Sequence, residues 1–151
     1  MLRTLVMGLI VTSAPLAAQQ NSLVGHWKMN YPGGAKFEDG VITQIPATGV
    51  LTIAVQGDSL IGTLVTDPAP DVPSRPPLHM SAVNHPDSAV FASQSKGMAN
   101  INGEQHPIMS MTSWNLHAHG DQIEGTLVRQ VVGIDAPPQG TLKVSGVRQK
   151  D

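Results

Sequence analysis

The sequence predicts an all-β protein, an antiparallel up-and-down (meander) β-barrel of about eight to ten strands. The chain has 15 glycines and 12 prolines among 151 residues, and only 13% of its residues are charged. That charge content is too low to cover the polar faces of several surface helices. Beyond the N-terminal segment, short runs of alternating apolar and polar residues are separated by Gly, Asp, Asn and Pro, a pattern typical of strands and turns.

The first strand is predicted over residues 23–31, LVGHWKMNY. Trp27 and Met29 lie two residues apart, so the period of two in a strand places both side chains on the inner face. A Pro-Gly-Gly turn is expected at 32–34. A short irregular strand is then expected over 36–44.

The segment GVLTIAVQGDSLIGTLV, residues 49–65, predicts a hairpin with Gly-Asp as its two-residue turn. This turn pairs Val55 with Leu60 and Leu51 with Leu64. The apolar side chains of both strands then share one face, as a hairpin in a barrel wall requires.

The turn and second strand of this hairpin recur along the chain. GDSLIGTLV at 57–65 matches GDQIEGTLV at 120–128 in six of nine positions, and a weaker copy, QGTLKVSGVRQ, lies at 139–149. Gly62 and Gly125 occupy matching places, and glycine inside a strand often marks curvature or a close approach. Repeated use of one strand-turn-strand unit predicts a meander.

Residues 67–77, DPAPDVPSRPP, contain five prolines in eleven positions. Because proline cannot donate to a ladder, this segment predicts a stiff loop at the rim of the barrel; the alternative is a lid or a partner-binding strip. The remaining strand-like segments are 78–84, 88–95, 96–102, 106–115 and 116–119.

The N-terminal residues 1–18 have the order of an export signal: Arg3, then an apolar run over 5–11, then small residues ending at Ala18. We therefore expect a signal peptide over 1–18 and a single barrel domain over 19–151. Cleavage after Ala18 would leave the mature protein in the periplasm or outside the cell. The apolar run is too short to cross a bilayer, which takes roughly 20 residues, so no membrane span is expected.

Cysteine content and charge limit the possible partners. The chain has no cysteine, so the fold is expected to hold without disulfides. Its formal net charge is −2 and it contains no basic run, so nucleic acid is not an expected partner.

Gly25-His26-Trp27 on the first predicted strand and Arg148 on the last resemble a pattern of the lipocalin-like barrels of the calycin group. In that group a first-strand Gly-x-Trp packs across the barrel floor beside an arginine from the final strand. The resemblance implies that Trp27 plugs the base and that Arg148 lies over its ring. A cation–π contact of this kind contributes about 0.5–2 kcal/mol.

A candidate metal site lies at the second hairpin, in the segment NLHAHGDQIEG. If Gly-Asp forms the turn, His119 pairs with Gln122 and His117 pairs with Glu124, so His117, His119 and Glu124 share one face. Two imidazoles and a carboxylate can hold zinc or another divalent ion. The alternative is a hairpin whose histidines face water, with Trp114 on the opposite, buried face.

The upstream methionines complicate this choice. Met109 and Met111 have the parity of His117 and not that of Trp114. A bulge near residues 112–113 would turn both apolar sets inward. Without a bulge, we expect the histidines to join the methionines inside the barrel, which would favour a buried site.

Three functions remain open from the sequence. The first is binding of a small apolar molecule in the open end of the barrel. The second is a metal-binding or metal-dependent protein, and the third is a non-catalytic structural or interaction module of the cell envelope. The residues expected to line the interior and bind the ligand are Trp27, Met29, Ile53, Val55, Leu64 and Trp114. No nucleophile elbow, P-loop or dinucleotide fingerprint occurs, so an enzyme is not favoured, and no cofactor is expected apart from the alternative metal.

Overall fold

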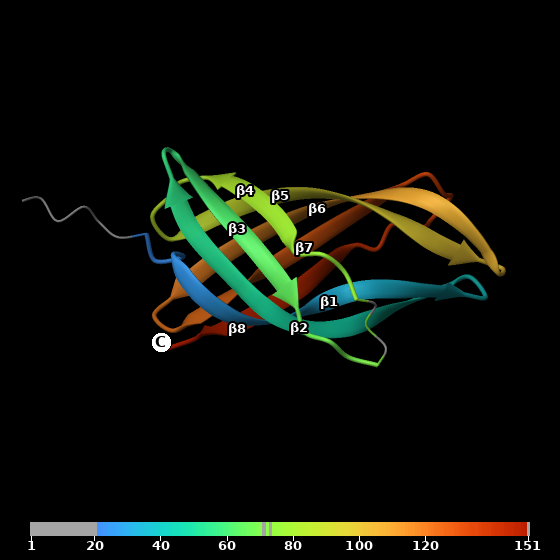
Figure 1. Ribbon diagram of the computed structural model, residues 1–151, viewed down its shortest axis with the longest axis horizontal. Coiled ribbons are helices and arrows are strands. Elements are labelled where there is room, and N and C mark those ends of the chain that lie inside the picture. Colours follow the sequence, from blue (N-terminus) through green and yellow to red (C-terminus); the bar gives the residue numbers. More distant parts are fainter. Residues whose placement is uncertain (1–20, 71, 73, 151) are drawn as a thin grey trace, which may run out of the picture.

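A computed structural model describes residues 21–70, 72 and 74–150 of the chain. These residues form a closed barrel of eight antiparallel strands in which every strand pairs with its sequence neighbours and β1 also pairs with β8 (Figure 1). The strands are β1 (Gly25–Glu38), β2 (Val41–Gln56), β3 (Ser59–Thr66), β4 (Leu78–Val83), β5 (Ser88–Ile101), β6 (Glu104–His119), β7 (Gln122–Val132) and β8 (Thr141–Arg148). The all-β meander barrel predicted from the sequence is confirmed. The expected signal peptide, 1–18, lies outside the described residues.

Two of the hairpin turns use residues with positive φ at both central positions. Asp39 and Gly40 have φ of 51° and 77°, and Asn102 and Gly103 have φ of 52° and 87°. Asx-Gly turns of this kind match the right-handed twist of the flanking strands, so β1–β2 and β5–β6 can continue as long ribbons.

Some predicted strand boundaries are wrong. Residues 32–34 do not form a turn: β1 runs through them, and its register with β2 shifts between Pro32 and Gly34. Gly33 is the extra residue of a bulge, and a Cβ there would overlap the Cβ of Ala47, so only glycine fits. Likewise, 88–95 and 96–102 belong to one strand, β5, and 106–115 and 116–119 belong to one strand, β6.

The hairpin registers predicted from the Gly-Asp turns are confirmed. Val55 pairs with Leu60 and Leu51 with Leu64 across β2 and β3. Gly62 also has the close approach that its position suggested, because a Cβ there would lie 2.8 Å from Cγ of Met80. The methionine side chain therefore fills the space that this glycine leaves.

The floor of the barrel is tied together by the two ends of the described chain. Trp27 is fully buried, and its indole Nε1 donates to the carbonyl of Leu23 at 2.8 Å. The Arg148 guanidinium lies 4.1 Å from the centroid of the Trp27 ring. It also donates to the carbonyls of Ser22 and Val24 at 2.7 and 2.8 Å, so one side chain joins β8 to the segment before β1.

At the opposite end the barrel wall is incomplete. The β2–β3 ladder covers only the second half of β2, and β5 forms a single ladder pair with β4, Ser81 with Ala92. The ribbons β1–β2 and β5–β6 therefore extend beyond the other strands at this end (Figure 1). Val72, from the proline-rich segment between β3 and β4, is buried in the core. Among the described residues no helix is long and apolar enough to cross a membrane.

Candidate binding cleft

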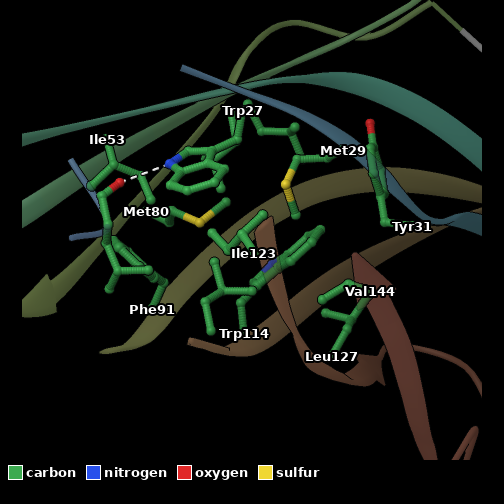
Figure 2. Close-up of a cluster of buried hydrophobic side chains, with 14 of the residues drawn as sticks. Trp27, Met29, Tyr31, Ile53, Met80, Phe91, Trp114, Ile123, Leu127 and Val144 are labelled. Atoms are coloured by element: carbon green, nitrogen blue, oxygen red, sulfur yellow. Dashed lines mark hydrogen bonds between the residues drawn. The ribbon is translucent and has the colours of Figure 1, made fainter. Parts of the chain in front are cut away.

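The six residues expected to line a ligand cavity lie mostly in a packed core. Trp27, Met29, Ile53, Leu64 and Trp114 are buried, whereas Val55 is half exposed near the end of β2. Figure 2 shows Trp27, Met29 and Trp114 among other apolar side chains of the barrel interior. None of the six lines the cleft described below. Their role in binding stays a prediction.

Glycines make room for the methionines that fill this core. A Cβ on Gly146 would lie 2.6 Å from Sδ of Met29, and Gly62 leaves similar room for Met80. Both methionines are buried. A long, flexible thioether opposite a glycine packs an irregular space that branched side chains fit poorly.

The candidate metal ligands lie on the outside of the barrel. His119 pairs with Gln122 and His117 with Glu124, as predicted. The side chains of His117, His119 and Glu124 are all exposed. Within the described ranges, no three His, Cys, Asp or Glu residues are grouped closely enough to hold a metal ion.

Two expectations concerned Met109 and Met111: a bulge near 112–113 that turns them inward, or, without a bulge, histidines that lie inside with them. Both are wrong. The ladder of β6 with β7 is unbroken from Met109 to His119, so there is no bulge near 112–113. The histidines do not join the methionines inside. Instead, Met109 and Met111 share the outer face with His117, and Met111 is 36% exposed.

A cleft of about 840 Å³ lies where β1 and β8 separate. The β1–β8 ladder has four pairs and ends at Asn30 and Ser145. Beyond that point the bulge in β1 coincides with a gap between the two strands. The cleft is lined by Asn30, Tyr31, Pro32, Gln44, Pro46, Ala47, Thr48, Ala69, His117, Glu124, Gly125, Thr126, Lys143, Val144 and Ser145.

The lining combines side chains from both faces of the barrel wall. Tyr31, Ala47 and Val144 are buried members of the core, whereas Lys143 and Ser145 are exposed on β8. The cleft therefore has an apolar floor that reaches the interior and polar walls that face solvent. A second hollow, about 410 Å³ on β5–β7, has no comparable floor of buried side chains.

Tyr31 is the link between the cleft and the core. Its ring meets the ring of Trp114 edge-on, with centroids 5.6 Å apart, and its hydroxyl points away from that ring (Figure 2). The hydroxyl is 2.7 Å from Oγ1 of Thr66. Burial raises the pKa of Tyr31, so the hydroxyl stays protonated and can donate a hydrogen bond.

An ion pair lies at one rim of the cleft, next to Thr48. Lys28 forms an ion pair with Asp67, and the Thr48 hydroxyl donates to the same carboxylate. The hydrogen bond from Lys28, followed by that from Thr48, lowers the pKa of Asp67. The carboxylate is therefore ionised and already partnered at neutral pH, which holds the start of the proline-rich loop against β1 and β2.

At the other rim, side-chain hydrogen bonds connect β1, β2 and β7 with the segment before β8, where the β1–β8 ladder has ended. Arg129 on β7 donates to the Pro32 carbonyl at 2.7 Å and to Oε1 of Gln139 at 3.3 Å. Nε2 of Gln44 donates to the same Gln139 oxygen at 3.3 Å. Oε1 of Gln44 is buried and has no hydrogen-bond partner among the described residues, so this amide offers an acceptor at the cleft wall.

Sequence reasoning singled out His117 and Glu124 only as alternative metal ligands, and it missed the rest of the cleft. Asn30, Lys143 and Ser145 are ordinary outward-facing strand residues whose local pattern carries no signal. The signal that could have located the cleft is Pro-Gly-Gly at 32–34, if it is interpreted as a bulge that ends a ladder and not as a turn.

Comparison of the sequence with protein-family models and curated proteins, and of the fold with solved structures, finds no match. The geometry of the cleft is therefore the basis on which a function can be inferred.

Proposed function

We propose that the protein is an exported β-barrel that binds one small molecule in the cleft between β1–β2 and β7–β8. The observation that carries this proposal is the volume of the cleft, about 840 Å³. Ligand pockets in proteins typically measure about 300–1,000 Å³. The barrel interior below the cleft is filled by buried apolar side chains, so the proposal places the ligand in the cleft and not inside the barrel.

The cleft favours a ligand with an apolar body and polar groups at its edge. Tyr31, Ala47 and Val144 form the apolar floor and Pro46 is exposed beside it; each 100 Å² of apolar surface removed from water contributes about 2.5 kcal/mol. The polar walls can orient the ligand, because the oxygen of the Gln44 amide has no hydrogen-bond partner among the described residues. The sequence predicted a small apolar ligand inside the barrel, and the proposal moves the ligand to the cleft and adds polar contacts.

Two further parts of the proposal rest on the sequence. The closed eight-stranded barrel is consistent with a lipocalin-like fold, and we infer that Gly25, Trp27 and Arg148 form the floor that such barrels share. The contact of Arg148 with Trp27 supports this inference.

The order of residues 1–18 supports export to the periplasm or beyond. Cleavage is expected after Ala18, and the intact mass of the exported protein tests this expectation.

Binding can be tested with N-phenyl-1-naphthylamine, a neutral aromatic probe whose fluorescence rises when it leaves water. Ser145→Phe places a ring in the cleft and is expected to weaken probe binding about tenfold, equivalent to about 1.4 kcal/mol. Val147→Phe is the matched control, because Val147 is exposed on the same strand but does not line the cleft. Trp114 provides a second signal, since its partner Tyr31 forms part of the floor.

If the wild-type protein does not bind the probe, or if both variants bind it equally well, the cleft is not the binding site. A protein that binds no small molecule would then fit the structural or interaction module that the sequence left open.

A further inference from the structure

Two arginines reach the β1 bulge, and neither lines the cleft. In the ladder of β1 and β2, Pro32 lies opposite Pro46. Neither proline has an N–H, so this pair can form no ladder hydrogen bond, and the Pro32 carbonyl accepts from Arg129 instead. The bulge thus brings a guanidinium from β7 to β1.

Arg75 reaches the same bulge from the proline-rich loop. Its Nη2 lies 3.9 Å from the position that a Cβ on Gly34 would occupy, two residues after Pro32. Arg75 is exposed, whereas Arg129 is half-buried. Burial, the larger cause, lowers the pKa of Arg129, and the positive charge of Arg75 lowers it further.

No acidic side chain of the described residues neutralises this pair. Among the described residues, ion pairs join Lys28 to Asp67, His85 to Asp87, His106 to Glu104 and Arg148 to Asp121. Neither Arg75 nor Arg129 takes part in one. Two nearby positive charges, one of them partly withdrawn from water, are destabilising until an anion joins them.

Arg129 also has unused donors. A guanidinium carries five N–H groups, and the hydrogen bonds of Arg129 use one on each Nη atom, to Pro32 and Gln139. The remaining N–H groups of Arg129 and the planar fork of the Arg75 guanidinium suit the paired oxygens of a carboxylate, sulfate or phosphate.

We propose that Arg75 and Arg129 form an oxyanion-binding site at the β1 bulge, which accepts a carboxylate, sulfate or phosphate group. The site adjoins the cleft through Pro32, but anion binding needs no ligand in the cleft. This proposal can therefore be tested independently of the proposed function. The oxyanion is either a free ion or the polar end of a longer molecule whose apolar part lies in the cleft.

Sulfate titration of the full mature protein at constant ionic strength tests the site, with binding measured by calorimetry or by amide chemical shifts. Arg75→Gln is expected to weaken sulfate binding about tenfold, since it removes a charge-assisted pair of hydrogen bonds. This variant retains the fold, because Arg75 is exposed. Arg129→Lys keeps the charge but loses the fork, and it is expected to weaken binding less.

Two controls locate the anion. Lys143→Gln removes a cation from the cleft wall, and Lys96→Gln removes an exposed cation from β5; both are expected to leave sulfate affinity unchanged. The proposal is overturned if the wild-type protein binds no sulfate, or if Lys143→Gln reduces binding and Arg75→Gln does not.

Decanoate and decanol separate the two sources of the oxyanion. Decanoate binding more tightly than sulfate, weakened by both Arg75→Gln and Ser145→Phe, would assign the site to the head of an amphiphile. Sulfate and decanoate binding equally well, both unaffected by Ser145→Phe, would assign it to a free ion; either result supports the arginine site. Decanoate and decanol binding alike, with no effect of Arg75→Gln, would contradict it.

Discussion

Replacing Arg148 with alanine tests whether the barrel floor is joined as the contacts indicate. The substitution removes two hydrogen bonds, to the carbonyls of Ser22 and Val24, and the cation–π contact with Trp27. Hydrogen bonds from a charged donor contribute about 1.5–3 kcal/mol each and the cation–π contact about 0.5–2 kcal/mol. The contacts share one side chain and do not add fully, so the expected loss is about 3–5 kcal/mol.

The ion pair of Arg148 with Asp121 adds little to this figure. The two groups are 3.6 Å apart, and the Asp121 side chain is 66% exposed, so solvent screens the attraction. Arg148→Lys keeps the charge but can serve only one of the two carbonyls, and we expect it to lose roughly half as much stability.

Urea unfolding followed by tryptophan fluorescence measures these losses. Lys150→Ala is the control, because it removes an exposed positive charge two residues along the chain. If Arg148→Ala lost less than about 1 kcal/mol, or no more than the control, then the floor would not depend on this side chain and the reasoning from its contacts would be refuted.

Three further predictions concern the floor, the cleft rim and the outer face. Gly25→Ala is expected to lower the midpoint of thermal unfolding, because Gly25 has a φ of 135° and its new Cβ would lie 2.6 Å from Nη1 of Arg148; an unchanged midpoint would contradict this. The lowered pKa of Asp67 stabilises the fold above the ordinary carboxyl pKa, and this contribution is lost as pH falls through the lowered value, so urea titrations between pH 7 and 3 should show a smaller loss of stability in Asp67→Asn than in wild type. His117 faces solvent, and metal analysis after mild purification should show the same zinc content in His117→Ala as in wild type; stoichiometric zinc that the substitution removes would support the metal site.

Local patterns predicted the pairing of strands well. The Gly-Asp turns define the registers of two hairpins, because a two-residue turn leaves one way for the flanking residues to pair. His117 therefore lies opposite Glu124, as predicted. The same patterns failed at Pro-Gly-Gly, where β1 bends and continues, since these residues suit a bulge as well as a turn.

Which face of β6 is buried could not be decided from its own residues. Trp114 and Met111 have opposite parity, and hydrophobicity alone does not rank one above the other. Trp114 lies inside, where its ring meets that of Tyr31. Met111 is left on the outside, because an unbroken strand can bury only one of its two faces in the barrel.

Alternation and turn chemistry are properties of neighbouring residues, and they were enough to determine the all-β class, the meander order and the inward set around Trp27. The cleft and the arginine pair depend on residues far apart in the chain, such as Arg129 at the Pro32 carbonyl. They exist because β1 leaves β8 after Asn30, and the length of a ladder between the first and last strands is decided by how the whole barrel closes.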